Sequence, residues 1–116
     1  MKAKTILEAM KTNAVQTLGG MMSTIYDIEE VVAKKEDGSF ERSIRVSAEV
    51  VKEKANRMWS GLRYTVKIPN GVLKLTEEEL EESDYFVSFE NLSISFIDSR
   101  NNVYFKAEDY SVEINE

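Results

Sequence analysis

Residues 31–46 read VVAKKEDGSFERSIRV, with Asp37-Gly38 lying between two runs of β-type residues. Asp-Gly in this position is a strong hairpin signal, because glycine accepts the positive φ that a tight turn requires. The first run, Met21–Lys35, is rich in Ile, Val and Tyr, and the second alternates polar and apolar residues from Phe40 onward. The sequence therefore predicts a long β-hairpin.

Further β-type segments follow this hairpin along the chain. Residues Leu62–Ile68 alternate apolar with polar side chains and are followed by Pro69-Asn70-Gly71, which predicts a strand and then a turn. Four short β-type segments flank a turn at residues 98–102, and we interpret them together as a second long hairpin. These segments are Tyr85–Phe89, Leu92–Ile97, Val103–Lys106 and Tyr110–Ile114.

A short helix is predicted between the third strand and the second hairpin. Thr76 and Glu79 have the spacing of a capping box, and Leu75 and Leu80 occupy the flanking staple positions. The surrounding run of glutamates is explained as a helix N-terminus, where the helix dipole favours negative charge. We therefore expect no metal ion at this acidic run.

Two other segments carry helical patterns. Apolar side chains recur at helical spacing from Ala3 to Leu18 and are followed by Gly19-Gly20, which predicts an amphipathic helix within residues 1–20. This helix either packs on the domain's own core or docks on a partner. Residues 47–59 fit both a helix capped by Ser47 and a continuing strand, and we favour a short helix.

This order of elements predicts a mainly β fold. We expect a small five-stranded, OB-like Greek-key barrel with one short helix between strands 3 and 4 and an N-terminal amphipathic helix. The helix takes up residues 1–20 and the single barrel domain residues 21–116. An unrelated antiparallel α+β sandwich would give a similar order of elements and stays open as an alternative.

Composition restricts the function classes. The 116 residues are 42% hydrophobic and 31% charged with one proline, as expected for one globular domain. The chain has no Cys and no His, which removes disulfides, the usual general base, the thiol nucleophile and nearly every zinc site. Carboxylate catalysis through Asp98, Glu108 or Asp109 is a weaker alternative. We expect a non-enzymatic protein without a cofactor or metal, and a cytoplasmic one without membrane contact, because residues 1–13 lack a continuous apolar run.

Charge is distributed unevenly along the chain, whose net charge is -6. Residues 41–67 hold seven bases and three acids, a net charge of +4, and interleave cations with aromatic rings. Single-stranded nucleic acid is bound by this combination, because cations follow the phosphates and rings stack on the bases. The predicted contact residues are Arg42, Arg45, Lys52, Lys54, Arg57, Trp59, Arg63 and Lys67. Alternatively, Trp59 and Tyr64 are core residues and the cations form a solvated face.

The C-terminal part is acidic, since residues 74–116 hold three bases and twelve acids, a net charge of -9. This surface fits a basic protein partner, and the predicted partner contacts are Glu77, Glu81 and Asp84. The protein would then be an adapter without direct DNA contact. A structural protein of a phage or mobile element is a further alternative, and the oligomeric state stays open.

The chain also resembles a known family over about Thr17 to the C-terminus. The resemblance rests on the order and spacing of five short motifs: Thr17-Leu18-Gly19, Glu36-Asp37-Gly38-Ser39, Lys52-Glu53-Lys54, Val66-Lys67-Ile68-Pro69 and Lys106-Ala107-Glu108-Asp109. In these the chain resembles the helicase processivity factor family, accessory proteins of Gram-positive integrative and conjugative elements. The resemblance implies an OB-like β-barrel that assists a helicase and a relaxase during unwinding, rolling-circle replication or conjugative transfer of a mobile element.

Overall fold

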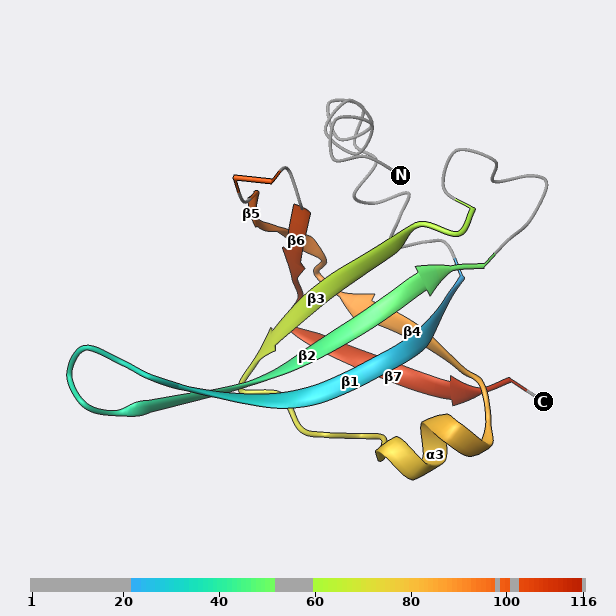
Figure 1. The fold of residues 1–116 in the computed structure, drawn as a ribbon, viewed down its shortest axis with the longest axis horizontal. Helices are drawn as coiled ribbons and strands as arrows, with labels where there is room; N and C mark the ends of the chain where they lie inside the picture. Colours follow the sequence, from blue (N-terminus) through green and yellow to red (C-terminus); the bar gives the residue numbers. More distant parts are fainter. Residues whose placement is uncertain (1–21, 52–59, 98, 101–102, 116) are drawn as a thin grey trace.

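The computed structural model describes residues 22–51, 60–97, 99–100 and 103–115 (Figure 1). These residues form a mainly β fold, in which seven strands make one sheet in the order β5-β6-β3-β2-β1-β4-β7. The predicted helix of residues 1–20 and the ambiguous residues 52–59 lie outside the described part. The elements are β1 (Ser23–Lys34), β2 (Phe40–Val50), β3 (Arg63–Pro69), α3 (Glu77–Glu82), β4 (Tyr85–Glu90), β5 (Ser93–Ile97), β6 (Val103–Lys106) and β7 (Asp109–Ile114).

The predicted first hairpin is confirmed as β1 and β2, which pair antiparallel along almost their whole lengths. Its turn closes where the sequence predicts, because Gly38 has a φ of 86° and its N–H donates to the Lys35 carbonyl at 3.0 Å. The Asp37 carboxylate accepts hydrogen bonds from both the N–H and the hydroxyl of Ser39. The distal part of this hairpin projects from the rest of the molecule as a two-stranded arm (Figure 1).

β2 continues through Val50, so the prediction of a short helix is wrong for residues 47–50. The alternation decides this, since Val46, Ala48 and Val50 all point into the core and are at most 1% exposed. β2 also pairs with β1 on one side and with β3 on the other, which a helix could not do. Local helical spacing is therefore overridden by two-sided strand pairing.

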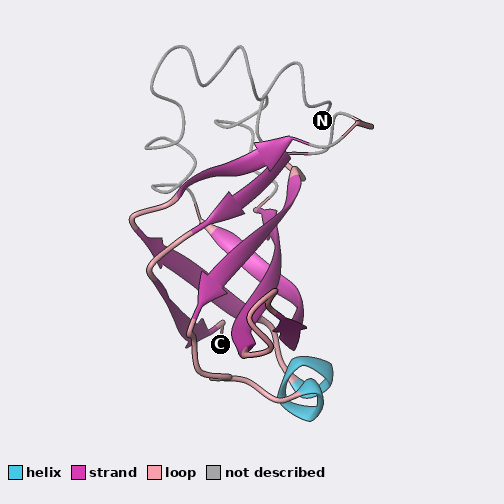
Figure 2. Cartoon of the chain, turned by 90° about the vertical axis from the view of Figure 1, so that its left-hand side faces the viewer, coloured by secondary structure: helices cyan, strands magenta, loops and turns pink. Residues whose placement is uncertain are grey.

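The short helix between the third and fourth strands is confirmed as α3, and its start is the predicted capping box. The Thr76 hydroxyl accepts from the Glu79 N–H at 3.1 Å, and the Glu79 carboxylate accepts from the Thr76 N–H at 3.2 Å. Leu75 is buried and Leu80 packs partly on the core. Figure 2 shows that α3 lies at one end of the curled sheet rather than across its face.

The structure has seven strands where the sequence predicts five, because both strands of the C-terminal hairpin are interrupted. Asn91 separates β4 from β5 with a φ of 53°, and the chain bends there. Opposite it, the Glu108 N–H donates to the Glu90 carbonyl at 2.9 Å between β6 and β7. As a result, β4 pairs with the start of β1, while β6 pairs parallel with β3. The bend thus places one half of the hairpin, β5 and β6, at one end of the strand order and the other half, β4 and β7, at the other end.

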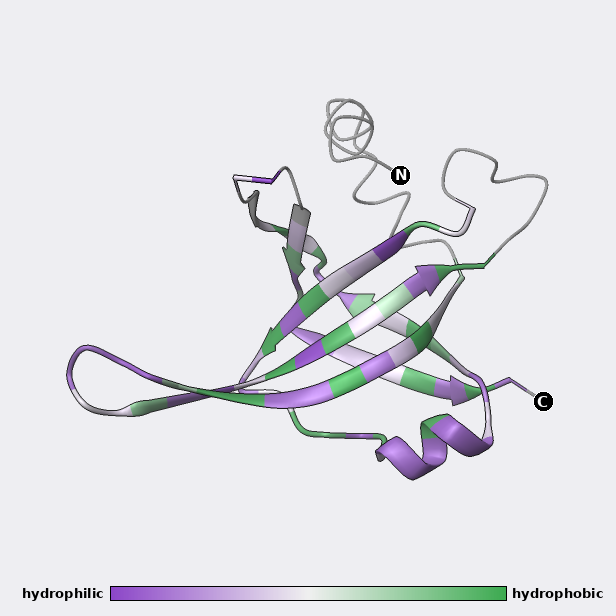
Figure 3. Cartoon of the chain, viewed as in Figure 1, coloured by the Kyte–Doolittle hydropathy of each residue, from purple (hydrophilic) through white to green (hydrophobic). Residues whose placement is uncertain are grey.

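The core lies inside the curl and is filled by alternate residues of the strands. Tyr64 of β3 stands at its centre, with its ring edge-on to Phe89 and to Phe105 at centroid distances of 6.1 and 5.8 Å. Apolar and polar positions alternate along the strands of the body (Figure 3). Within the described residues, no helix has the length and apolar character needed to span a membrane.

Candidate nucleic-acid interface

The candidate site lies on the side of β1, β2 and β3 that faces away from the core. Ile44 and Val46 of β2 point inward, so Arg45 between them points outward, as does Lys67 of the adjacent β3. We call this surface the outer face. Its residues are Tyr26, Glu29 and Val31 of β1; Glu41, Ser43, Arg45 and Glu49 of β2; and Arg63, Thr65 and Lys67 of β3.

A groove of about 230 Å³ crosses the outer face. The arm contributes Val31, the centre contributes Arg45 and Lys67, and β5 and β6 contribute Ser95 and Tyr104. The distance across the groove from β1 to β6 is three strand spacings, about 14 Å. Pockets for whole small molecules usually measure roughly 300–1,000 Å³, so this groove suits part of a longer chain better than an enclosed ligand.

The three predicted cations on the outer face are each paired with a carboxylate of a neighbouring strand. Arg45 contacts Glu29 at 2.9 Å. The Arg63–Glu49 and Lys67–Glu41 pairs are both 3.4 Å long. The outer face is therefore a ladder of ion pairs rather than a bare cationic surface. Each exposed pair contributes only about 0–1 kcal/mol, so a phosphate group can compete with the carboxylate.

An aromatic ring accompanies these cations. The guanidinium of Arg63 lies over the Tyr26 ring, 4.8 Å from its centroid, and Tyr26 is 46% exposed. The sequence prediction missed Tyr26, which lies outside the basic segment 41–67 and stands at a bulge between Ile25 and Asp27 of β1. It also missed Tyr104 in the groove, whose only sequence signal is its place beside the turn at residues 98–102.

The other predicted nucleic-acid contacts are placed differently. Arg42 lies three residues before Arg45 in an unbroken strand and so points to the opposite side of β2. Lys52, Lys54, Arg57 and Trp59 lie outside the described residues. The structure thus brings together Arg45, Arg63 and Lys67 of the predicted set, but not Arg42.

Tyr64 belongs to the core, as the alternative interpretation held. It is 5% exposed, and its hydroxyl donates to the Ser23 Oγ at 2.6 Å. Burial raises the pKa of Tyr64 to about 12, although the hydrogen bond with Ser23 acts in the opposite direction. Its ring therefore cannot stack on a base at the surface.

The predicted partner-binding carboxylates Glu77, Glu81 and Asp84 are all exposed at α3 and the start of β4. Glu77 and Glu81 are one helical turn apart and share a face of α3. The last turn of α3 contains no basic residue. α3 thus presents an acidic surface at the opposite end of the molecule from the arm tip (Figure 1).

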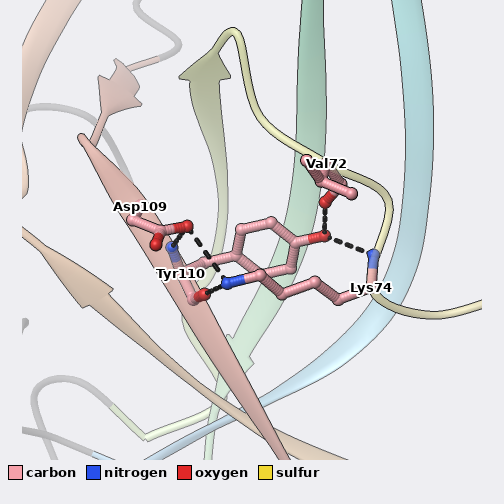
Figure 4. A network of polar contacts seen from close by, with 4 residues as sticks. All are labelled: Val72, Lys74, Asp109 and Tyr110. Atoms are coloured by element: carbon pink, nitrogen blue, oxygen red, sulfur yellow. Dashed lines mark hydrogen bonds and ion pairs between the residues drawn. The ribbon is translucent and has the colours of Figure 1, made fainter.

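Of the carboxylates considered for catalysis, Asp98 lies outside the described residues, while Glu108 and Asp109 make contacts with neighbouring segments. Asp109 accepts hydrogen bonds from the Tyr110 N–H and from the Lys74 ammonium, which together lower its pKa. Lys74 also donates to the Tyr110 carbonyl, and the Tyr110 hydroxyl bridges the Val72 carbonyl and the Lys74 N–H (Figure 4). Glu108 accepts from the Asn91 side chain at 2.7 Å. Among the described residues no group of three or more acidic side chains could hold a metal ion.

Comparisons of the chain with protein-family models, with curated proteins and with solved structures find no match. The resemblance to the helicase processivity factor family therefore stays a prediction. The groove, the paired cations and the connectivity of the strands are the observations from which a function is argued.

Proposed function

We propose that this chain is a non-enzymatic, OB-type domain that binds single-stranded nucleic acid across its outer face. The observation that carries the proposal is the groove between the arm and the β5–β6 pair, which contains Arg45, Lys67 and Tyr104. OB folds bind oligonucleotides on this same part of their sheet, between the loop joining strands 1 and 2 and the loop joining strands 4 and 5.

The strand connectivity supports the OB assignment. Counting β4 with β5 and β6 with β7 as two bent strands leaves five strands. The third then pairs parallel with the fifth through Val66 and Phe105, and the first pairs antiparallel with the fourth through Thr24 and Phe86. With the helix between strands 3 and 4, this is the order of a five-stranded Greek-key barrel.

In this proposal the ion pairs of the outer face break when a nucleic-acid strand binds. Phosphates replace Glu29 and Glu41 as partners of Arg45 and Lys67, while the rings of Tyr26 and Tyr104 offer stacking surfaces. The released carboxylates are partly exposed and regain water. Following the resemblance, we place this activity in the DNA processing of a mobile element, where the domain assists a helicase and a relaxase.

Arg45 and Arg42 provide a matched test, because they carry the same charge on opposite sides of one strand. Binding of a fluorescent oligothymidylate is measured by anisotropy for the wild type, Arg45→Gln and Arg42→Gln at several salt concentrations. We expect Arg45→Gln to weaken binding about tenfold and to reduce the salt slope, by at most about 0.7, which is the value for one phosphate contact on a single strand. Arg42→Gln keeps the wild-type affinity. Absence of binding at low salt, or equal losses in both variants, refutes the proposal.

A second candidate function is the protein adapter, favoured by the exposed carboxylates of α3 with no basic residue in its last turn. A basic partner such as a helicase or relaxase would bind there by charge complementarity. Co-precipitation of such a partner with Glu77→Lys/Glu81→Lys is compared with Glu113→Lys, an exposed carboxylate on β7. Equal retention by both variants excludes α3 as the contact.

A further inference from the structure

β1 has a long uncovered edge. It pairs with β2 along its whole length, but it pairs with β4 only at Ser23 and Thr24. Residues Glu29–Lys35, which we call the arm edge, run along the projecting arm and away from α3 (Figure 1). An exposed strand edge of this length is a template for pairing with another strand.

The hydrogen-bonding groups of the arm edge can be assigned by alternation. The Lys35 N–H donates to the Ser39 carbonyl at 2.7 Å, so Lys35 faces β2. The backbone groups of successive residues in a strand point to opposite edges, so every second residue before Lys35 also faces β2. The backbone groups of the residues between them, Glu30, Val32 and Lys34, point away from β2. Among the described residues, no backbone hydrogen bond from another segment reaches these groups. The row ends at Ile28, whose N–H donates to the Asp27 carboxylate at 3.0 Å.

We propose that the arm edge binds the arm edge of a second copy of this chain, antiparallel, around a two-fold axis at Val32. In this register Val32 lies opposite Val32 of the second copy, and Glu30 lies opposite Lys34 of the second copy. Glu29 likewise lies opposite Lys35 of the second copy. Opposite charges directly across an antiparallel pair are stabilising, and symmetry makes each pair occur twice.

The charges of the arm edge also reject the neighbouring registers. A two-fold axis at Glu30 would place Glu30 against its own copy, and an axis at Ala33 would place Glu30 against Glu36. An axis at Lys34 would put two lysines together. An axis at Val31 would pair Glu30 with Val32, Glu29 with Ala33 and Lys34 with Ile28, so that only Lys35 would lie opposite an acidic residue, Asp27. Only the axis at Val32 matches every charge of the arm edge, and this complementarity is the reason for choosing a second copy as the occupant.

The proposed pairing covers apolar surface that the single chain leaves in water. Val32 is 52% exposed and would contact Val32 of the second copy. Because the two-fold axis is perpendicular to the sheet, the outer faces of both copies point to the same side. One short strand pair buries less than a standard interface of roughly 1,600 Å², so we expect micromolar rather than nanomolar association.

A charge swap tests the register in the whole 116-residue chain. Sedimentation velocity over a wide concentration range should show a monomer–dimer equilibrium for the wild type. Glu30→Lys and Lys34→Glu should each weaken it about tenfold or more, because two attractive pairs become repulsive. The double variant Glu30→Lys/Lys34→Glu should restore it. A wild type that stays monomeric, or single variants that dimerise as well as the wild type, overturns the proposal.

Two further variants test the backbone contact and its position. Val32→Pro removes an N–H that the β1–β2 ladder does not use, so the hairpin tolerates it while the dimer is lost. Because the chain has no cysteine, Val32→Cys should form a disulfide-linked dimer under mild oxidation. Directly opposite residues lie about 5.5 Å apart, within disulfide reach. Val72→Cys, which is more exposed than Val32 but lies away from the arm edge, is the control, and equal cross-linking of both overturns the proposal. None of these readouts depends on nucleic-acid binding.

Discussion

Replacement of Tyr64 by phenylalanine should change the alkaline stability of the protein in a way that the structure allows us to calculate. Tyr64 is buried, and its pKa is raised from 10.0 to about 12. A tyrosine whose pKa is raised by folding holds its proton more tightly in the folded state. Its contribution to stability is therefore complete below pH 10 and is lost as the pH rises through about 12.

The magnitude follows from the two pKa values. The difference between 10.0 and about 12 is worth about 2.7 kcal/mol in full, of which about 1.4 kcal/mol is lost by pH 11. At pH 7 Tyr64→Phe removes the hydrogen bond with Ser23 and leaves the Ser23 hydroxyl buried without this partner. The loss lowers the free energy of unfolding by about 1–3 kcal/mol. The stability advantage of the wild type over Tyr64→Phe should thus shrink between pH 7 and pH 11.

The measurement is urea denaturation of both proteins at pH 7, 10 and 11, followed by circular dichroism. Every other titrating group is common to the two proteins, so the difference between their unfolding free energies isolates Tyr64. We expect that difference to fall by about 1.4 kcal/mol from pH 7 to pH 11. A difference that stays constant over this range would refute the assignment of Tyr64 as a tyrosine protected by burial.

Three further substitutions test the contacts that shape the fold, each by the change in unfolding free energy. Tyr110→Phe should cost about 1–2 kcal/mol, because the Lys74 N–H and the Val72 carbonyl lose their partner but both residues are exposed enough to regain water; no loss would contradict the bridge. Thr76→Ala should cost about 1 kcal/mol by removing the cap of α3, and a neutral result would mean that α3 is held by packing alone. Gly38→Ala should cost about 1 kcal/mol or more, because its φ of 86° is strained for alanine although its surroundings are open, and equal stability would argue against this turn.

Features fixed by neighbouring residues were predictable from the sequence. The Asp37-Gly38 turn and the capping box of Thr76 and Glu79 depend on chemistry within four residues, and both are confirmed. The bend at Asn91 depends instead on how the C-terminal hairpin spans the curled sheet. No local signal distinguishes an asparagine that bends a strand from one that ends it, so the count of five strands differs from the seven observed.

The candidate site shows the same limit in its electrostatics. Counting charges along residues 41–67 gave a basic segment, but the partner of Arg45 is Glu29, sixteen residues away on β1. Glu49 and Arg63, fourteen residues apart, meet only because β2 and β3 are in register. The sequence counts therefore included the outer-face cations Arg45, Arg63 and Lys67, but they did not separate them from Arg42 on the other side of β2. They also did not show that cross-strand carboxylates neutralise these cations. Strand register, which is a long-range property, determines that result.

The paired cations also constrain how the outer face can bind a nucleic-acid strand. On a bare cationic groove, each phosphate contact contributes about 0.7 to the salt slope, and affinity falls steeply with salt. Here salt also weakens the Arg45–Glu29 and Lys67–Glu41 pairs that compete with the phosphates, so its two effects partly cancel. The proposed binding is consequently weaker at low salt and less salt-sensitive than the number of cations suggests.

Glu29→Gln, which removes one competitor while keeping Arg45, should therefore bind an oligonucleotide more tightly and with a steeper salt slope than the wild type. A variant that binds no better than the wild type would show that Arg45 does not exchange its carboxylate for a phosphate.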